Sequence, residues 1–447
     1  MGNVEENILA FYDAASNDRV DEALTAAKEL CIADLADALE TLDAEKAKRL
    51  LERLPNRADV FVYFEPETQM QFARELSRSS FARLISEMPA DDRADIFKQL
   101  DQGQRDTLLP ALAQAEREDI RKLSAYIEGT AGSLMTSDYA TLKKDMNVVE
   151  ALASLRLEAP DAETIYHAYV IDKDRKLIGV VSLRVLILAN AGALINDLMV
   201  SDPIHCKVSD HQEEVAKKIA RYDLIALPVT DEEGAMVGIV THDDAMDVVS
   251  EEATEDFMLT GGMASTVSNL KEASIGLLYR KRIFWLVFLV FGNLFSGAGI
   301  AYYEDIIASN LVLIFFLPLL IGSGGNAGSQ SSTLVVRALA TGEIVTKDWL
   351  KLLGRESVLA LCLGGTMAAA ISTLGYMRGG EMVAFVLILS MVAIVMVGCV
   401  IGMSLPFVLN RVGFDPASAS APLVASVCDV AGVVIYLFIA SQFLQLG

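Results

Sequence analysis

The sequence predicts a multidomain membrane protein with an α-helical superhelical N domain, an α/β pair of repeats, a connecting helix and a five-helix transmembrane domain. Apolar residues recur at helical spacing through residues 1–130, which contain no strand-like run. Residues 131–250 change to short alternating segments that occur twice. Five long apolar spans follow residue 281, each long enough to cross a bilayer as a helix.

The acidic charge of the chain is concentrated before the apolar spans, in residues 1–282. The 447 residues are 53% hydrophobic and 22% charged, which is apolar for a soluble protein and charged for one that lies wholly in a membrane. Six bases and eight acids follow Arg282, so the first 282 residues carry about −21 of the net charge of −23. Such a surface repels nucleic acid and attracts divalent cations.

The motifs of several other classes of protein are missing. The five cysteines form no CxxC pair and the four histidines form no HExxH, so neither a disulfide framework nor a zinc site is predicted. We find no GxxxxGK[ST] loop, no nucleophile–base pairing and no cofactor motif, and we therefore expect no enzyme. The polar, acidic N-terminus predicts that no signal peptide is cleaved.

Residues 1–130 are expected to form an acidic, regulatory helical domain. A short Ala-Asp-apolar unit begins at Ala36, Ala58 and Ala94, and Pro55 and Pro89 stand just ahead of the second and third copies. Proline in that position is typical of helix starts. Stacked helical hairpins in a small superhelix are predicted, with an ordinary helical bundle as the alternative.

Residues 131–194 and 195–252 repeat one α/β unit. Each copy opens with Leu-Met, carries two short strands around a polar turn, and has a glycine before the last strand and a helix after it. The first copy contains Leu134-Met135, strands within 166–183 and Gly179; the second contains Leu198-Met199, strands within 224–241 and Gly238. This order resembles a tandem pair of CBS domains, which implies a sensor of a nucleotide or a metal.

Residues 253–280 are expected to form a connecting helix, within a helical pattern that begins near residue 243. Gly261-Gly262 predicts a break, with a second segment from about Ser265 into Tyr279. Acids stack on one face at i, i+3, i+7 and i+11 and on a second at i, i+4: Asp244, Asp247, Glu251 and Glu255, then Glu252 and Asp256. Such a face is either simply solvated or kept for divalent cations, which take several carboxylate oxygens.

The apolar spans predict both topology and a pathway. They lie near 283–302, 310–338, 356–376, 383–409 and 417–445. Bases gather before the first span, between the second and third, and between the fourth and fifth. The positive-inside rule therefore places the acidic N-terminal part in the cytoplasm and the C-terminus outside.

Polar residues interrupt the second span between Pro318 and Ser332. Four glycines, Asn326, Gln330 and several serines would unsettle a helix that faces lipid. Polar backbone and side chains at that depth are tolerated where they line a water-filled cavity. We favour a pore-lining role for this stretch; close helix packing through small residues is the alternative.

The last span contains one ionisable residue, Asp429, near its middle. A carboxylate at membrane depth is costly unless it faces protein or water, so it is a candidate functional site. Ala425, Asp429 and Gly432 share one helical face, which leaves room for a hydrated ion or a partner helix. An ion pathway is the favoured interpretation, and a hydrogen bond to a neighbouring helix is the alternative.

Taken together, the chain resembles the MgtE family of bacterial magnesium channels and transporters along essentially its whole length. The most specific marks are Gly324-Gly-Asn-Ala-Gly-Ser-Gln-Ser331, Ala253-Thr-Glu-Asp256 and Phe414-Asp-Pro416. The resemblance implies a homodimer in the bacterial inner membrane, with one pore on the two-fold axis within a transmembrane domain of residues 281–447. It also implies that Asp429 is the pore carboxylate for a largely hydrated Mg2+ ion.

The resemblance further implies that cytosolic Mg2+ closes the pore by binding between the N domain, the CBS pair and the connecting (plug) helix. The sensor positions matched by motif are Asp244, Asp247, Glu252, Glu255 and Asp256, with Asp91, Asp95, Glu213 and Asp223 as weaker matches. ATP at the CBS pair is left open as a modulator. The alternatives are transport of Mn2+ or Co2+, a nucleotide-sensing membrane protein that transports nothing, and an anion channel, which the acidic pore candidate disfavours.

Overall fold

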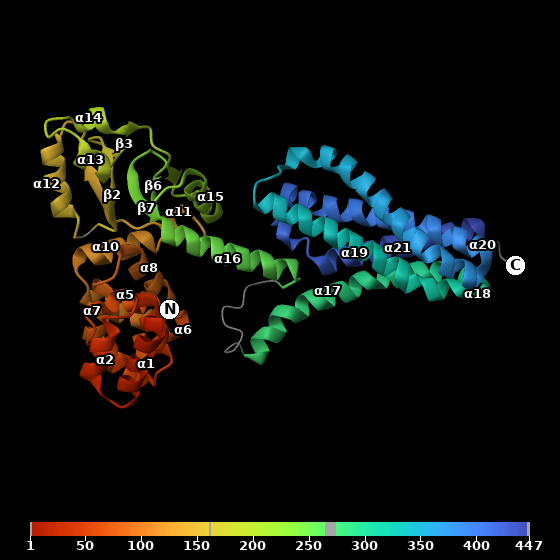
Figure 1. The fold of residues 1–447 in the computed structure, drawn as a ribbon, viewed down its shortest axis with the longest axis horizontal. Coiled ribbons are helices and arrows are strands. Elements are labelled where there is room, and N and C mark those ends of the chain that lie inside the picture. Colours follow the sequence, from red (N-terminus) through yellow and green to blue (C-terminus); the bar gives the residue numbers. More distant parts are fainter. Residues whose placement is uncertain (1, 161, 264–273, 445–447) are drawn as a thin grey trace. The chain divides into compact units, whose positions relative to one another are not determined.

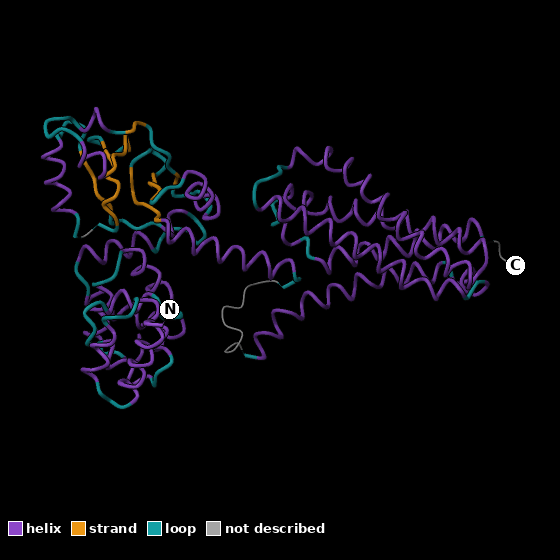
Figure 2. The backbone as a smooth tube through the Cα atoms, viewed as in Figure 1, coloured by secondary structure: helices purple, strands orange, loops and turns teal. Residues whose placement is uncertain are grey.

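The structure, a computed structural model, describes residues 2–160, 162–263 and 274–444. The chain divides into two compact units, Met1–Val249 and Ser250–Gly447 (Figure 1). Figure 2 shows the strands gathered in one part of the chain, with helical segments before and after it. The multidomain architecture predicted from the sequence is therefore present.

The first part of unit one is a stack of short helices. Helices two apart in sequence touch, from α1–α3 through α3–α5 and α5–α7 to α7–α9, which is the arrangement of a superhelix. Pro89 is the N-cap of α8, as its position before an Ala-Asp unit predicted. The helices are α1 Gly2–Ser16, α2 Val20–Ala27, α3 Ile32–Glu40, α4 Ala44–Leu51, α5 Arg57–Val62, α6 Pro66–Glu75, α7 Arg78–Ser86, α8 Ala90–Gln99, α9 Gln102–Leu108, η1 Leu109–Ala111 and α10 Gln114–Leu123.

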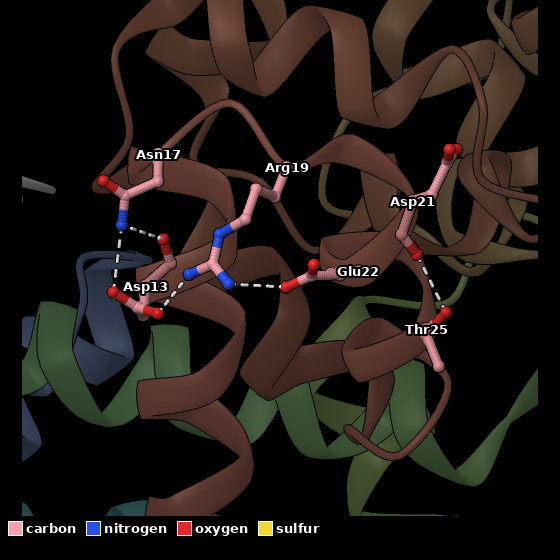
Figure 3. Close-up of polar contacts among 6 residues, drawn as sticks. All are labelled: Asp13, Asn17, Arg19, Asp21, Glu22 and Thr25. Atoms are coloured by element: carbon pink, nitrogen blue, oxygen red, sulfur yellow. Dashed lines mark hydrogen bonds and ion pairs between the residues drawn. The ribbon is translucent and has the colours of Figure 1, made fainter.

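Polar contacts fix the corner between α1 and α2 (Figure 3). Arg19 stands between the helices, where it forms ion pairs with Asp13 and, at 2.6 Å, with Glu22. Asn17 donates to the backbone oxygen of Asp13 at 2.8 Å and so closes the end of α1. These contacts are exposed and each stabilises little, so the buried apolar core of the stack sets the fold.

The second part of unit one contains two sheets of the repeated α/β unit. In each, one strand pairs in parallel with the next, which pairs antiparallel with a third. The order β1-β2-β3-β4 forms one sheet and β5-β6-β7 the other. The elements are α11 Ala131–Leu134, β1 Tyr139–Leu142, α12 Val148–Glu158, β2 Thr164–Ile171, β3 Leu177–Ser182, α13 Leu183–Leu188, α14 Ile195–Leu198, β4 Val200–Ser201, β5 Cys206–Lys207, α15 Gln212–Tyr222, β6 Ala226–Thr230, β7 Met236–Thr241 and α16 His242–Thr260.

The repeated Leu-Met and glycine positions pack on one another. A Cβ atom at Gly179 would lie 2.6 Å from Sδ of Met199, and one at Gly238 would lie 2.7 Å from Sδ of Met135. The methionine that opens each repeat therefore covers the glycine of the other repeat. This exchange explains why both copies carry the same two features.

Unit two consists of long apolar helices. Among the described helices four are long and apolar enough to cross a membrane, and the longest, α20, contains two of the five expected spans. Gly380 breaks it with φ +77°, and a Cβ atom at Gly375 would meet Ala384 at 3.2 Å, so the two halves fold back on each other. The elements are α17 Ile275–Tyr302, α18 Glu304–Ser309, α19 Val312–Ala340, η2 Thr346–Asp348, α20 Trp349–Val412, η3 Pro416–Ser418 and α21 Ala421–Phe443.

Small residues let α19 and α20 approach very closely. A Cβ atom at Gly402 would lie 1.9 Å from the carbonyl oxygen of Gly328, and one at Gly398 would lie 2.5 Å from that of Gly324. Close packing, which was the alternative interpretation of the glycine-rich span, is therefore one role of these glycines.

The connecting segment is interrupted at the glycine pair where a break was expected. Helix α16 begins at His242, within the second repeat, and ends at Thr260, because Gly262 adopts φ +77° as the Gly-Gly pair predicted. The expected segment from about Ser265 lies partly outside the described residues. Tyr279 belongs to α17, which continues into the first apolar span.

Candidate functional site

Asp429 lies two turns inside α21, beside a glycine of α19. A Cβ atom at Gly325 would lie 3.3 Å from Oδ1 of Asp429 and 3.5 Å from Ala425. The Asp429 side chain is half-buried, and within the described ranges its carboxylate makes no hydrogen bond or ion pair with another residue. The small residues thus bring two helices together around a carboxylate that no protein group neutralises.

A polar face of α19 is open next to this carboxylate. Asn326, Gln330, Thr333 and Arg337 are exposed and follow helical spacing on one side of the helix. This stripe lies about a quarter turn from Gly325, since each residue advances about 100°. Polar side chains on an apolar membrane helix need water or another polar surface, which makes this face a candidate wall of an aqueous path.

Gly432 is placed differently from the other residues predicted to line a pore. It is buried, and a Cβ atom there would lie 3.7 Å from Cα of Ile321 and 3.6 Å from Ile394. Ala425 sits at the approach to Asp429, whereas Gly432 lies in the packed interior between helices.

Hydroxyl groups of α19 and α21 hold the carboxylate in place. Ser329 donates to the carbonyl of Ala421 at 3.2 Å, and Ser332 donates to that of Ala419 at 3.0 Å. Tyr436 donates to the carbonyl of Leu313 at 3.2 Å near the other end of the pair. These bonds fix the start of α21 and its register against α19.

A second carboxylate in the apolar unit was missed by the sequence reasoning. Glu356 of α20 lies with Oε1 at 2.5 Å from Oγ of Ser331, which is buried. An acid at the start of an apolar span was the signal that could have singled it out. Unlike Asp429 it has a protein partner.

Acidic residues also gather in unit one, where α8 meets the start of α16. Ala90 and Ala94 of α8 belong to the same buried cluster as Ala245 of α16. The carboxylates of Asp91 and Asp244 are therefore brought close together, and the charge of Asp244 adds to the effect of burial in raising the pKa of Asp91.

Burial and mutual repulsion perturb these acids strongly. The pKa of Asp92 rises to about 7, first through burial and then through the charges of Asp244 and Glu163. Burial likewise raises the pKa of Asp244 to about 6, although Thr241 donates a hydrogen bond to it at 2.5 Å. The pKa of Asp91 is raised well above its ordinary value, and its buried Oδ1 has no hydrogen-bond partner among the described residues.

The cluster is acidic but not a finished metal site. Within the described ranges, no three His, Cys, Asp or Glu side chains converge closely enough to hold a metal ion. A cation would have to draw the carboxylates inward. The carboxylates of α8 and α16 thus repel one another when no cation lies between them.

The remaining predicted acids lie elsewhere. Asp95 pairs with Lys98 at 2.7 Å, and Glu213 pairs with Lys217 at 2.7 Å. Asp223 is exposed and ends α15 in a left-handed conformation with φ 51°. Asp247 lies one turn after Asp244, and the acids farther along α16 are Glu252, Glu255 and Asp256. Glu163 was missed because the loop before β2 carries no motif, and Asp92 of α8 was missed although it adjoins Asp91.

A cavity of about 230 Å3 opens between the two repeats. Its lining includes His167, Tyr169 and Val180 from the first repeat and Ala226 from the second. The Tyr169 hydroxyl is buried and lacks a hydrogen-bond partner in the described part of the chain. The site therefore offers a small ligand mostly apolar walls together with the Tyr169 hydroxyl and the polar side chains of His167 and Asp202.

We predict that, without divalent cations, raising the pH from about 5 to about 8 destabilises unit one. Folded Asp92 keeps its proton up to about 7, whereas the unfolded chain loses it near 4, so stability falls as pH rises between these values. Each kcal/mol lost lowers Tm by about 2–4 °C for a unit of this size. Calorimetry of the purified protein with a chelator measures Tm as a function of pH. Asp92→Asn should make Tm depend less on pH, whereas Glu45→Gln, at an exposed position, should leave that dependence unchanged. A Tm that rises with pH would contradict this.

Three family models match the chain. The MgtE intracellular N domain matches residues 30–129, the CBS domain matches 131–192 and 195–251, and the MgtE divalent cation transporter domain matches 317–439. Two crystal structures are also similar. The soluble part of a magnesium transporter shares 33% identity with a TM-score of 0.53, covering 56% of this chain and 99% of that one. The cytosolic domain of the Mg2+ channel MgtE in complex with ATP shares 34% with a TM-score of 0.52, covering 54% and 99%.

Full-length relatives extend the similarity over both units. The magnesium transporter MgtE of Thermus thermophilus is 36% identical over 417 residues, which cover 92% of this chain and 93% of the relative. That of Bacillus subtilis is 30% identical over 99% of this chain and 98% of the relative. The chain therefore belongs to the MgtE family of divalent cation transporters.

Proposed function

We propose that this protein is a Mg2+-selective channel or transporter for magnesium uptake that cytosolic Mg2+ closes. The observation that carries the proposal is the Asp429 carboxylate, which is half-buried among apolar helices and has no counter-charge among the residues that the structure describes. A charge in that position is stable only with water or a cation beside it. Relatives named magnesium transporters over the whole chain favour Mg2+ as that cation.

The pathway is formed by a homodimer. The two-fold axis places two copies of Asp429 and two polar faces of α19 opposite one another, which supplies the surface that Asn326 and Gln330 lack in one chain. Ala425 keeps the approach wide, while Gly432 lets α21 pack closely. Mg2+ gives up its water reluctantly, so the carboxylates hold a largely hydrated ion through its water molecules.

The protein lies in the bacterial cell membrane with its N-terminus in the cytoplasm and its C-terminus outside. The bases Arg280, Lys281 and Arg282 lie in the second turn of α17, ahead of its apolar span, and Arg411 lies near the end of α20. Both sets of bases are expected to face the cytoplasm. The match of unit one to a cytosolic domain supports this orientation.

Cytosolic Mg2+ closes the pathway by relieving repulsion among acids. Without a cation, Asp91 and Asp92 oppose Asp244 across the contact between α8 and α16. At an effective dielectric constant of about 20, a charge pair at 4 Å is worth roughly 4 kcal/mol before desolvation. A few bridging ions therefore supply the roughly 5.5 kcal/mol that a complete switch requires.

The sensor extends along α16 and onto neighbouring elements. Further sensor acids continue the acidic faces of α16: Asp247, Glu252, Glu255 and Asp256. Asp95 and Glu213 join the sensor when a cation replaces their lysine partners, and the exposed Asp223 joins it directly. Because binding and closing are reciprocal, high internal Mg2+ shuts its own route of entry.

ATP binds as a modulator in the cavity between the two repeats. The cavity has apolar walls for a base, and the buried hydroxyl of Tyr169 lacks a partner among the described residues. A similar cytosolic domain forms a complex with ATP, which supports this ligand.

Transport of Mn2+ or Co2+ is the nearest alternative, since hard oxygen ligands accept several divalent ions. A nucleotide-sensing membrane protein that transports nothing is the other. Flux through the purified protein in liposomes, with the divalent cation changed one at a time, separates the three.

Asp429→Asn should reduce Mg2+ flux into liposomes by at least about tenfold, because it removes the charge that attracts the ion at membrane depth. Glu356→Gln is the matched control, since this other carboxylate already has Ser331 as a partner. Unchanged flux through Asp429→Asn would remove Asp429 from the pathway.

Neutralising Asp244, Asp247 and Glu255 together should leave the pathway open at Mg2+ concentrations that close the wild type. The bridging ions then lack their ligands, so the Mg2+ needed for half-closure rises by about tenfold or more. Flux at a series of Mg2+ concentrations on the cytosolic side measures the shift. The control neutralises three exposed acids of the N-terminal helices, Glu29, Asp37 and Glu45; an equal shift there would show a general charge effect.

Tyr169→Phe should weaken ATP binding by about fivefold, which corresponds to one hydrogen bond of about 1 kcal/mol. Isothermal titration calorimetry on the full-length protein measures the change. Tyr166→Phe is the control, because Tyr166 lies on the same strand but is exposed. Equal affinities for all three proteins would place ATP elsewhere.

A further inference from the structure

Helix α16 ends in a tight turn rather than fraying. The N–H of Gly262 donates to the carbonyl of Leu259 at 2.8 Å, and that of Met263 donates to the carbonyl of Met258 at 2.9 Å. With Gly262 at φ +77°, these bonds form a Schellman motif. The last turn of α16 is therefore a rigid end with a defined direction.

This end is pressed against two membrane helices. A Cβ atom at Gly262 would lie 2.6 Å from Nε1 of Trp285 on α17 and 3.3 Å from Cγ of Pro422 on α21. Any side chain at this position would have to displace an indole ring or the first turn of α21. Gly261 is different, because a Cβ atom there would meet its nearest neighbour, a carbonyl of its own helix, at 3.4 Å.

Trp285 is held in this contact by packing, without a hydrogen bond from its indole to the described residues. Its ring stacks on Phe288 with centroids 5.5 Å apart and planes at 22°. Its Nε1 is buried and has no acceptor among the described residues. Burial of the apolar ring area stabilises the contact. Burial of the indole N–H without an acceptor costs free energy and so opposes it.

The contact reaches the helix that carries Asp429. Leu259 packs in the same apolar cluster as Ala417 and Ala419, just before α21 begins. Pro422 precedes Asp429 by seven residues, which is two turns of helix and about 10 Å along one face. A movement of the end of α16 therefore displaces the start of α21 directly.

We propose that Gly262 and Trp285 form a joint between the connecting helix and the pore helix. Trp285 is a positioning residue that packs on the backbone of Gly262. It holds the first turn of α21 in a closed position, in which ions do not pass Asp429. When α16 leaves, the indole N–H gains water and α21 is released. This inference rests on the proposed gating function, because α16 also carries Asp244 near its start.

Tryptophan fluorescence follows this joint, since Trp285 and Trp349 are the two tryptophans of the chain. In the full-length Trp349→Phe protein in liposomes, adding Mg2+ on the cytosolic side should shift the emission of Trp285. The half-maximal shift should fall at the Mg2+ concentration that half-closes the pathway. An emission that does not respond to Mg2+, while flux does, would overturn the joint.

Substitutions test whether the contact closes the pathway. Gly262→Ala and, separately, Trp285→Phe should let flux persist at Mg2+ concentrations that stop the wild type, with half-closure raised about tenfold. Gly261→Ala is the matched control and should close normally. A role confined to folding would reduce flux at every Mg2+ concentration, and that result, like normal closure of both variants, would overturn the proposal.

These variants distinguish a failure of the Gly262–Trp285 joint from a failure of the proposed Mg2+ sensor. If neutralising Asp244, Asp247 and Glu255 keeps the pathway open while Gly262→Ala closes normally, the joint is wrong and the Mg2+ sensor stands. If the neutralised protein closes normally, the sensor assignment fails, whatever the joint variants do.

Discussion

The structure depends on carboxylates that the fold brings close without giving them a positive partner. At the contact between α8 and α16, packing of Ala90, Ala94 and Ala245 brings acids together. Burial, followed by the charges of Asp244 and Glu163, raises the pKa of Asp92 there to about 7. Apolar burial supplies the free energy for this approach, because like charges oppose it. The contact therefore forms although like charges oppose it, which is the property that the proposed cation sensor requires.

The membrane unit also places a carboxylate without a positive partner among the described residues, but it does so through small residues. Gly325 and Ala425 have too little side chain to separate α19 from α21, so Asp429 lies against backbone instead of against a counter-charge. Serine hydroxyls of α19 bond to the backbone at the entry of α21, which fixes the carboxylate without neutralising it. Small residues and backbone acceptors thus hold Asp429 in place where another protein would use an ion pair.

Periodicity and spacing predicted most of the architecture, because each element follows a local rule. The helical stack, both α/β repeats and the five spans are visible as periods in the sequence, and Gly261-Gly262 marks the end of α16. Contacts between distant segments were not predictable in this way. Met135 covers Gly238 and Met199 covers Gly179 across the repeats, and Glu163 joins the acids from a loop without any motif. Asp91 and Asp244 were found through family resemblance, while Asp92 was missed although it adjoins Asp91.

Helix α16 is suited to connect the two kinds of site because it is one continuous element. Its 19 residues span about 28 Å, with Asp244 in the first turn and the glycine turn at the other end. The proposed gate requires that a small displacement where the acids meet reaches the far end of this helix. Coupling of this kind requires an element with two arrangements whose balance both sites bias. In the proposed gate, repulsion among the acids supplies one bias. The other bias comes from the indole N–H of Trp285, which has no acceptor among the described residues. Both act against the docked arrangement, so a cation that removes the first leaves apolar packing to overcome the second.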